Sequence, residues 1–574
     1  MCCHPRNAGA AALILAALWC APAAAQTVVT ACGTDTAPGG VNLANALAAG
    51  GNIVIRCATG GTTIAITDAH VLRRPTTIDG EGRVTLDGGG RLPMFIIHDA
   101  GAKLVLRRMT VQRGMNPFLN HPGSDAPSGG IVSSRGEVEL WNVRTRASKE
   151  PYDVRALRAY DRSTFEDNTG EFVVRAREAT FVEATIGANT GSPLTQSLQR
   201  IDSRPRASFE RSDIHGNQRP IAWFGDLDLS HSRFTNNGSP QTLGGAVLLH
   251  DGTMAVARTD FINNKAASGG AITIFGGRLE VRRATFEGNM AQQRGGALWV
   301  HSGSTGFIEV RLRYAKFRRN RAQDGGAIAL EGHLQGGAVL FAGNEASRHG
   351  GAIDVPRGLM EIARGTFVDN AAGAAGGAIR SGSTGYDRVQ LGNALLVRNR
   401  APSGGAFIGR TLDLTNASVV SNQGGGLSIV PLPTGFTDPP GGVALRNTLL
   451  SQNAGGNCTG ETASVADEGQ NLQFPDAGCG AGIRVADPTL DSMFVPTLGS
   501  PARFSGDPKI CLEHPLVAAR DVYGSERPTY EKCTIGAVEH DLERHAVRLL
   551  PNRRELPEKL REFFAFIGVR SAGR

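Results

Sequence analysis

The chain has 574 residues, of which 75 are glycine, and a net charge of +7 from 60 basic and 53 acidic side chains. Glycine is about twice as frequent as in an average protein, which argues against a helix-rich enzyme because glycine destabilises helix interiors. The glycines follow no period of three, which excludes collagen, and the 41% of hydrophobic residues disfavours a disordered chain. Only 6% of the residues are aromatic, so we expect a mostly aliphatic core.

Residues 1–25 have the features of a secretory signal peptide. Arg6 gives a positively charged start, an apolar run extends from Ala10 to Leu18, and three alanines at 23–25 offer a cleavage site before Gln26. The apolar run is too short for a stable membrane anchor, and no later stretch is long and apolar enough to span a bilayer. We therefore expect an exported bacterial protein, secreted or held at the cell surface or in the periplasm, without a transmembrane span.

The cysteines are typical of an oxidising compartment. Three of the nine lie in the predicted signal peptide, and the remaining six cluster near the two ends of the chain, as Cys32, Cys57, Cys458, Cys479, Cys511 and Cys533. An even number in this arrangement predicts disulfides that staple the ends. The sequential pairing 32–57, 458–479 and 511–533 is the simplest of the fifteen connectivities that six cysteines allow. No cysteine or histidine spacing is typical of a zinc site, so a metal site is the weaker reading.

Two short motifs recur through the middle of the chain. An aromatic or aliphatic residue followed three positions later by asparagine recurs about every 26 residues. Its twelve copies begin at Phe165, Ile186, Ile214, Phe234, Phe261, Phe286, Phe317, Phe341, Phe367, Leu396, Val419 and Leu450. A Gly-Gly pair followed by alanine and an apolar residue begins at Gly244, Gly269, Gly295, Gly325, Gly350, Gly376 and Gly404, with a looser copy at Gly425. So many copies indicate an internal repeat.

The period and the pattern predict a coil of three short strands. A repeat of this length is too short for helix pairs or propeller blades. After each Gly-Gly pair the second and fourth residues are apolar, and this alternation marks a strand with one face inward. We expect the Phe positions to stack in the core between coils. The Asn positions tolerate a left-handed backbone and can bond amide to amide, and the Gly-Gly pair forms a corner that side chains would block.

These repeats resemble those of the chlamydial polymorphic outer membrane proteins and, more broadly, the right-handed parallel β-helix of the pectate-lyase-like superfamily. The segment at 499–539 is similar to the choice-of-anchor Q segment of secreted bacterial β-helix proteins, although 503–505 read Arg-Phe-Ser where such segments usually carry Ile-Asp-Ala. The resemblance covers roughly residues 30–540 and implies an all-β, right-handed, single-stranded parallel β-helix. Because one fold hosts many functions, it implies little about activity.

Five parts of the chain are expected from these features. A signal peptide at 1–25 precedes an N-terminal cap at 26–60, with a short helix near 41–47 and a first strand at 51–55. The β-helix repeats occupy 61–455 and a disulfide-bearing C-terminal cap occupies 456–540. Residues 541–574 form a charged, amphipathic tail, which packs on the last coil, stays unattached or serves as a basic surface anchor.

The strand pattern also predicts a candidate binding site. If the second and fourth residues after Gly-Gly point inward, the third and fifth point outward, and neighbouring coils then place Trp299, His301, Glu331, Asp354 and Arg380 on one face. The third positions are Leu248, Thr273, Trp299, Ala329, Asp354 and Arg380, and the fifth are His250, Phe275, His301, Glu331, Pro356 and Gly382. An aromatic ring beside acids and an arginine suits a sugar-binding groove or a proton-transfer pair. An ordinary solvated outer face is the alternative.

Two functions remain open from the sequence. The first is a non-catalytic, adhesin-like protein that binds a polysaccharide or a cell-surface glycan along its flank. The second is a polysaccharide lyase or glycoside hydrolase acting on an acidic polysaccharide, but its motifs are absent and no catalytic residue can be named. Four acidic residues are only loosely clustered, namely Asp226, Asp228, Asp251 and Asp260, and the Arg-rich stretch from Arg311 to Arg321 is expected to be a solvated loop. We expect no cofactor, no metal, no nucleic-acid partner and a monomer.

Overall fold

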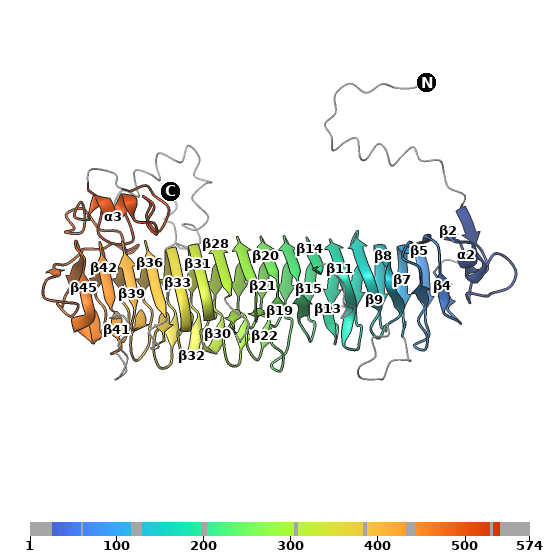
Figure 1. Cartoon of the computed structure of the whole chain (residues 1–574), viewed down its shortest axis with the longest axis horizontal. Coiled ribbons are helices and arrows are strands. Elements are labelled where there is room, and N and C mark those ends of the chain that lie inside the picture. The colour runs from blue at the N-terminus through green and yellow to red at the C-terminus, as the bar shows by residue number, and fades with distance from the viewer. Residues whose placement is uncertain are drawn as a thin grey trace, which may run out of the picture. The chain divides into compact units, whose positions relative to one another are not determined.

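The structure is a computed structural model that describes residues 26–58, 61–115, 129–196, 204–302, 308–382, 387–431, 442–527 and 532–539. The predicted signal peptide and the charged tail at 541–574 lie outside the described residues. The chain divides into two compact units, residues 1–203 and residues 204–574. Each unit consists of parallel β-strands stacked coil on coil (Figure 1), so the predicted all-β parallel β-helix is confirmed. Within these ranges, no helix has the length and apolar character needed to cross a membrane.

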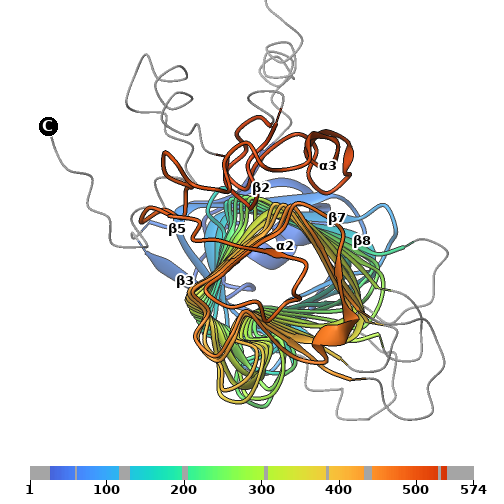
Figure 2. The ribbon, with the colours of Figure 1, turned by 90° about the vertical axis from the view of Figure 1, so that its left-hand side faces the viewer.

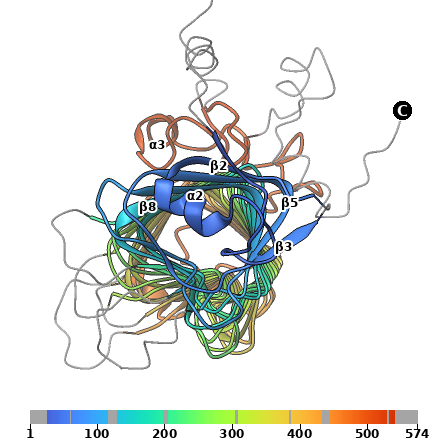
Figure 3. The same cartoon turned by 90° about the vertical axis from the view of Figure 1, so that its right-hand side faces the viewer.

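The first unit begins with a helical cap on its first coil. Helix α2 (Leu43–Ala49) starts at Asn42, whose side chain accepts a hydrogen bond from the backbone N–H of Asn45, and it buries Leu43, Ala46 and Leu47. The helix lies against the first strands (Figure 3). The predicted first strand is β2 (Gly51–Ile55), but β1 (Gln26–Val29) precedes it and pairs with it in parallel. Four residues were too few to show a strand pattern in the sequence.

The remaining strands of the first unit pair in parallel from coil to coil. They are β3 (Thr62–Ala65), β4 (His70–Leu72), β5 (Thr76–Asp87), β6 (Phe95–Ile97), β7 (Lys103–Gln112), β8 (Ile131–Arg146), β9 (Tyr152–Tyr160), β10 (Thr164–Glu166), β11 (Phe172–Val182), β12 (Thr185–Gly187) and β13 (Ser192–Gln196). Several of these strands bend around a corner and so belong to two faces of the coil.

In the second unit each coil contributes three main strands, which stack into three faces. Face A holds β16 (Ile221–Phe224) and, in later coils, the strands that follow a Gly-Gly pair: β19 (Val247–Asp251), β23 (Ile272–Ile274), β27 (Leu298–Val300), β35 (Ile379–Ser381), β38 (Phe407–Gly409), β41 (Leu427–Ile429) and β44 (Cys458–Gly460). The long strands β31 (Ile328–Ala342) and β33 (Ile353–Val368) run through all three faces.

Faces B and C follow in chain order within each coil. Face B comprises β14 (Arg206–Glu210), β17 (Asp226–Ser230), β20 (Thr253–Ala257), β24 (Arg278–Arg282), β28 (Glu309–Arg313), β36 (Arg388–Gly392), β39 (Leu412–Thr415), β42 (Val443–Arg446) and β45 (Val465–Asp467). Face C comprises β15 (Asp213–His215), β18 (Arg233–Thr235), β21 (Asp260–Ile262), β25 (Thr285–Glu287), β29 (Lys316–Arg318), β37 (Leu395–Val397), β40 (Ser418–Val420), β43 (Leu449–Ser451), β46 (Leu472–Phe474) and β47 (Arg484–Val485).

A separate five-stranded parallel sheet stands between faces C and A, and we call it the ridge. It consists of β22 (Lys265–Ala266), β26 (Met290–Ala291), β30 (Arg321–Asp324), β32 (Glu345–His349) and β34 (Ala371–Ala372). Its strands lie between each asparagine of the repeat and the next Gly-Gly pair. The Arg-rich stretch from Arg311 to Arg321 is therefore not a loop, because it runs through β28, β29 and the start of β30.

The phenylalanines of the repeat stack inside the coil as predicted. Six of them form a continuous column with adjacent ring centroids 4.7 to 5.1 Å apart and nearly parallel rings, namely Phe234, Phe261, Phe286, Phe317, Phe341 and Phe367. All six are fully buried. The repeated phenylalanine thus supplies one layer of the hydrophobic core in each coil.

The asparagines form a buried ladder beside this column. Each side-chain Nδ2 donates to the Oδ1 of the asparagine in the next coil at 2.9 to 3.1 Å, from Asn237 to Asn453. The Nδ2 of Asn289 also donates to the backbone oxygen of Phe261, and this bond too recurs along the ladder. The predicted amide pairing is correct. The left-handed residue, however, is the one before each asparagine, such as Asn263 with φ of 55°.

The Gly-Gly corner is as tight as the sequence suggested. At Gly295, where φ is 62°, a Cβ atom would lie 2.1 Å from the backbone oxygen of Leu298. At the following Gly296 it would lie 2.0 Å from the backbone oxygen of Gly326 in the next coil. Any side chain at either position would push neighbouring backbones apart.

The last part of the chain folds back onto the outside of face C. From the coil of Leu340 onward, most outward side chains of this face are apolar and buried, including Leu340, Val368, Leu395, Val420 and Leu449. They form one hydrophobic cluster with Val495, Ala502, Val522, Ile535, Ala537 and Val538. Figure 2 shows this segment, with α3 (Pro508–Glu513), lying outside the coils. We call residues 486–539 the C-terminal strap.

The predicted disulfides are formed in sequential pairs. Cys32 bonds Cys57 in the N-terminal cap, Cys458 bonds Cys479 beside the last coils, and Cys511 bonds Cys533 within the C-terminal strap. Each bridge therefore closes a local loop of 21 to 25 residues.

Candidate functional site

The alternation along face A places side chains as the sequence predicted. The second and fourth residues after each Gly-Gly pair are fully buried from Val247 to Val355. The third and fifth residues lie on the outside, but they are not all solvated. Thr273, Ala329 and Asp354 are at most 3% exposed, whereas Trp299 and Arg380 are half-buried. Outward direction alone therefore does not make a side chain accessible.

Five aromatic side chains form a continuous run on the outside of face A, which we call the aromatic strip. The members are Phe224, His250, Phe275, Trp299 and His301, contributed by four successive coils. Phe224 and His250 are stacked with centroids 4.3 Å apart, and His250 lies 5.7 Å from Phe275. Phe275 contacts Trp299 and His301 at 5.6 and 5.8 Å. The strand register sets this spacing, because three coils add one ring each at the end of the face A strand and the coil of β27 adds two, Trp299 and His301.

The rings of the aromatic strip are open to solvent to different degrees. Phe224 exposes 47% of its surface, an unusual amount for a phenylalanine on a folded protein. The other four are half-buried, because each contacts a neighbouring ring of the aromatic strip. Burial holds the pKa of His250 below its ordinary value near 6.5, so this ring is neutral at pH 7. From Phe224 to Phe275 the aromatic strip is thus an apolar platform.

Charged groups meet the aromatic strip at its Trp299 end. The Nδ1 atom of His301 lies 2.6 Å from Oε2 of Glu331, and Nη1 of Arg294 lies 2.9 Å from the other carboxylate oxygen. Arg294 comes from the loop that leads into the Gly-Gly corner, and Glu331 ends the face A part of β31. The aromatic strip therefore has hydrogen-bonding groups of both signs at one end.

Asp354 and Arg380 form a second, separate cluster. They are cross-strand neighbours on β33 and β35, and the Arg380 guanidinium binds both carboxylate oxygens of Asp354. Burial raises the pKa of Asp354, although the hydrogen bond from Arg380 opposes this effect. Asp324 on the ridge lies close enough to act on Asp354 electrostatically, and it is itself bound by Arg348 and by His349 at 3.0 Å.

The five predicted site residues are thus brought together in two groups. Trp299, His301 and Glu331 share one contact network, while Asp354 and Arg380 pair with each other one coil beyond Ala329. Sequence reasoning did not select Phe224, His250 and Phe275. His250 and Phe275 occupy the fifth position after Gly-Gly, as His301 does, so a search for aromatic residues in that column would have found them.

The loosely clustered acids do not form a metal site. Asp226 and Asp228 lie on β17, Asp251 ends β19 and Asp260 begins β21. Across the described ranges, no three histidine, cysteine, aspartate or glutamate side chains come close enough to hold a metal ion.

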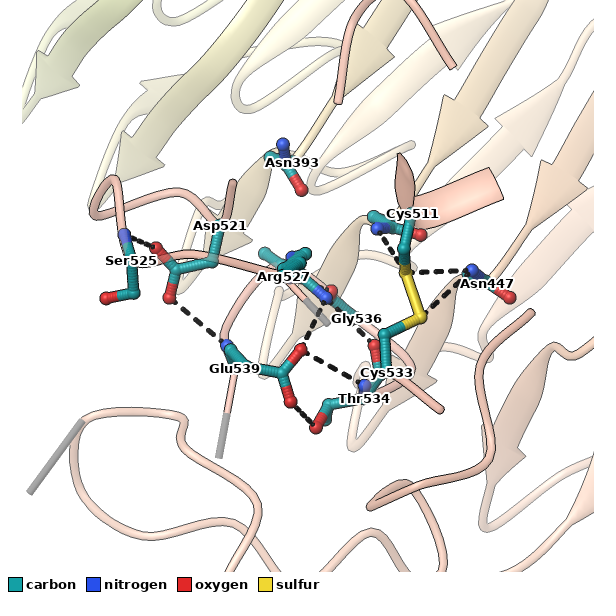
Figure 4. Close-up of polar contacts among 12 residues, drawn as sticks. Asn393, Asn447, Cys511, Asp521, Ser525, Arg527, Cys533, Thr534, Gly536 and Glu539 are labelled. Carbon is teal, nitrogen blue, oxygen red and sulfur yellow. Dashed lines mark hydrogen bonds and ion pairs between the residues drawn. A yellow bond between two sulfur atoms is a disulfide. The ribbon is translucent and has the colours of Figure 1, made fainter. Parts of the chain in front are cut away.

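A buried ion cluster in the C-terminal strap is the other concentration of charge. The side chains of Arg527 and Glu539 are at most 1% exposed, and Nη1 of Arg527 lies 3.3 Å from Oε2 of Glu539 (Figure 4). Arg527 also donates to the backbone oxygens of Thr534 and Gly536, while Asp521 accepts from the backbone N–H groups of Ser525 and Glu539. These groups bind one another and have no access to solvent, so the cluster holds the fold of the strap rather than a ligand.

Neither family models, nor curated proteins, nor solved structures give a match to this chain.

Proposed function

We propose that the protein is a non-catalytic, adhesin-like binder of glycans that docks sugar rings on the aromatic strip. The observation that carries this proposal is the unbroken run of five rings over four coils, with Phe224 nearly half exposed. A sugar ring has an apolar face of C–H groups that packs on an aromatic ring, while its hydroxyl groups need polar partners. Arg294 and Glu331 offer such partners at the end of the aromatic strip.

The arrangement suits a chain of sugars rather than a single one. From Phe224 to Trp299 the rings of the aromatic strip come from successive coils, about 4.8 Å apart along the axis, and so present a row of contacts on a rigid support. Because the rings are held by a packed sheet, little side-chain freedom is lost on binding. A linear glycan lying along the axis would touch several rings at once, and weak contacts would add up.

The experiment that tests this proposal is a glycan-binding screen with matched variants. Phe224→Ala removes the most exposed ring and is expected to weaken binding of any glycan found by about tenfold, the loss of one stacking contact. Phe504→Ala removes another exposed aromatic side chain, on the C-terminal strap, and is the control. Both variants are expected to keep the wild-type melting temperature. Equal effects of the two variants on affinity, or wild-type protein that binds no glycan, would refute the proposal.

A cleaving enzyme, the second function considered, has less support. The predicted acids Glu331 and Asp354 are both engaged by arginines, and Asp354 is only 3% exposed. A general acid or base must reach the substrate proton within hydrogen-bond distance. Release of unsaturated products or reducing ends from acidic polysaccharides would nevertheless establish this alternative.

The export of the chain and its family are part of the same proposal. Three disulfides are compatible with an extracytoplasmic protein, secreted or at the cell surface or in the periplasm. Sequence motifs alone support three further points of this proposal, namely membership of the pectate-lyase-like superfamily, a choice-of-anchor Q segment and a signal peptide. Mass spectrometry of the mature protein, with an expected N-terminus at Gln26, tests the signal peptide directly.

A further inference from the structure

Four exposed arginines lie together where face B turns into face C, and we call this group the arginine edge. Arg258, Arg282, Arg283 and Arg313 come from three successive coils, at the ends of β20, β24 and β28. Tyr314, which exposes 47% of its surface, follows Arg313 on the same edge. The aromatic strip is at the end of face A, so the whole width of face B separates the two surfaces.

The positive charge of the arginine edge is not neutralised within the described part of the chain. Nη1 of Arg258 contacts the ring of His231 at 3.1 Å, and the guanidinium of Arg283 lies 5.9 Å from the ring of Tyr314. None of the four forms an ion pair there with a carboxylate, since Glu280 is paired with Arg278 and Glu287 with Arg319. Asp260 is the one exposed acid beside Arg258, and it forms no ion pair either among the described residues.

The arginines also lie close enough to repel one another. Arg282 and Arg313 are direct cross-strand neighbours, a pairing of like charges that destabilises a sheet. With coils about 4.8 Å apart, all four charges lie within roughly one Debye length at physiological salt, so their potentials add. Such a cluster weakens the free protein unless an anion binds it.

The residue after the face B strand has a left-handed backbone in each coil of the second unit from Arg211 to Asn447. Arg258, Arg283 and Tyr314 occupy the residue after the face B strand and have φ of 49°, 56° and 57°. A left-handed backbone is strained for such side chains, by roughly 1–3 kcal/mol, and asparagine tolerates it better. At the same place in three successive coils covered by the C-terminal strap, the residue is asparagine, as Asn393, Asn416 and Asn447, whereas Arg364 occupies it in the coil before them.

Those asparagines show what this position does when a chain lies over it. Nδ2 of Asn393 donates to the backbone oxygen of Val517, and Nδ2 of Asn447 donates to the backbone oxygen of Asp507. The same column of the coil therefore binds acceptor oxygens of a segment running over it. In the coils of β20 and β24 this position is arginine, as Arg258 and Arg283, and a guanidinium group prefers an anion to a neutral carbonyl as its acceptor.

We propose that the arginine edge is a second binding site, and that it takes an acidic polysaccharide whose carboxylate or sulfate groups lie across successive coils. The guanidinium group binds such planar or trigonal oxyanions through two parallel N–H donors and is weakly hydrated, so it exchanges water for an anion at low cost. Tyr314 offers a flat surface for a sugar ring beside the charges. This site does not depend on glycan binding at the aromatic strip.

The test compares two pairs of arginines that carry the same charge. Arg282→Gln with Arg313→Gln removes half of the arginine edge, and Arg219→Gln with Arg400→Gln removes two exposed arginines elsewhere in the second unit. Binding is measured for heparin, for polygalacturonate, for neutral dextran and for single-stranded DNA, over a range of salt concentrations. Heparin and polygalacturonate distinguish sulfate from carboxylate as the preferred group.

The edge variant is expected to bind the acidic polysaccharides at least tenfold more weakly, with a flatter dependence of affinity on salt. The control pair is expected to change affinity little, and dextran is expected not to bind at the edge. Because like charges are removed, the melting temperature of the edge variant should equal or exceed that of the wild type. Arg282→Lys with Arg313→Lys keeps the charge but loses the paired N–H donors of the guanidinium group, and this variant is expected to recover only part of the affinity.

Three outcomes would overturn this proposal. The first is an equal loss of polysaccharide affinity in the edge variant and in the control pair. The second is wild-type protein that binds neither heparin nor polygalacturonate, and the third is DNA bound as tightly as either polysaccharide. Phe224→Ala separates this proposal from the function proposed above, because it is expected to leave heparin binding at the arginine edge unchanged. Loss of heparin binding in Phe224→Ala would place the anion on the aromatic strip instead.

Discussion

His250 lies on the outer side of β19, a strand whose alternate side chains form part of the core. It lies between Phe224 and Phe275 in the aromatic strip and is half-buried there, although its neighbours Leu249 and Val247 are the ones that point inward. Burial lowers its pKa, because a protonated ring would lose solvation without gaining a carboxylate partner.

This shift predicts a loss of stability in mild acid. Below pH 6.5 the unfolded chain binds a proton at His250 before the folded protein does, so stability falls as pH drops from that value through the lower folded pKa. His250→Phe keeps an aromatic ring in the strip and is expected to show a smaller drop in melting temperature between pH 7.5 and pH 5.5. His231→Phe, at an exposed histidine, is the control. An unchanged drop in His250→Phe would contradict the assignment.

The direction of each side chain in face A could be predicted from the sequence, but its exposure could not. Alternation shows that Trp299 and Asp354 point outward, and they do. It does not show that Arg380 in the next coil binds over Asp354, or that the ridge brings Asp324 nearby. Exposure depends on what neighbouring coils and loops place over a residue, and a period of two contains no such information.

At the scale of elements, face C changes character along its length. In β29 the outward residues are Lys316 and Arg318, whereas in β37 they are Leu395 and Val397, so that strand is apolar on both sides. A strand buried on both faces reads as a continuous apolar run rather than an alternating one. The sequence therefore contained the signal for the C-terminal strap, in the change from Lys-Phe-Arg to Leu-Leu-Val.

A charge placed on the covered part of face C is expected to detach the C-terminal strap. Leu395 is 0% exposed and packs in the cluster that holds the strap, so Leu395→Asp buries an unpaired carboxylate unless the strap lifts away. The measurement is limited proteolysis within 486–539, which should become faster by about tenfold or more. Thr285→Asp changes the corresponding position of face C in an uncovered coil and should leave cleavage unchanged. A strap that stays protected in Leu395→Asp would show that the cluster does not hold it.

At the scale of the whole molecule, each of the three disulfides stabilises the segment in which it lies, and none of them joins segments that are far apart in the sequence. Sequential pairing closes three loops of similar length, one in the N-terminal cap, one beside the last coils and one in the C-terminal strap. The grouping of the cysteines predicted the Cys32–Cys57 bridge, because the long repeat region separates this pair from the other four. Among those four, sequential pairing was only the simplest of three connectivities.

Removing one bridge should therefore have a local effect. Cys511→Ala with Cys533→Ala is expected to cost about 3 kcal/mol of stability, from the loop that the bridge closes, and to expose the C-terminal strap to protease. Cys458→Ala with Cys479→Ala removes a bridge of nearly equal loop length and should leave the strap protected. Cleavage within the strap at the same rate in both variants would mean that the bridges act on the molecule as a whole.

The asparagine ladder has a consequence for how such a protein changes length over evolution. Between Asn237 and Asn453, each inner coil receives one side-chain amide hydrogen bond from the coil before it and gives one to the coil after it, in the same direction throughout. A gene segment encoding one whole coil could thus be duplicated or deleted without leaving an unmatched donor or acceptor inside. Phenylalanine and Gly-Gly repeat in the same phase and would be carried along with it. Recombination between repeats would then alter the number of binding positions on the surface while the interior stays the same, so that the extent of the glycan surface can vary between descendants independently of the fold.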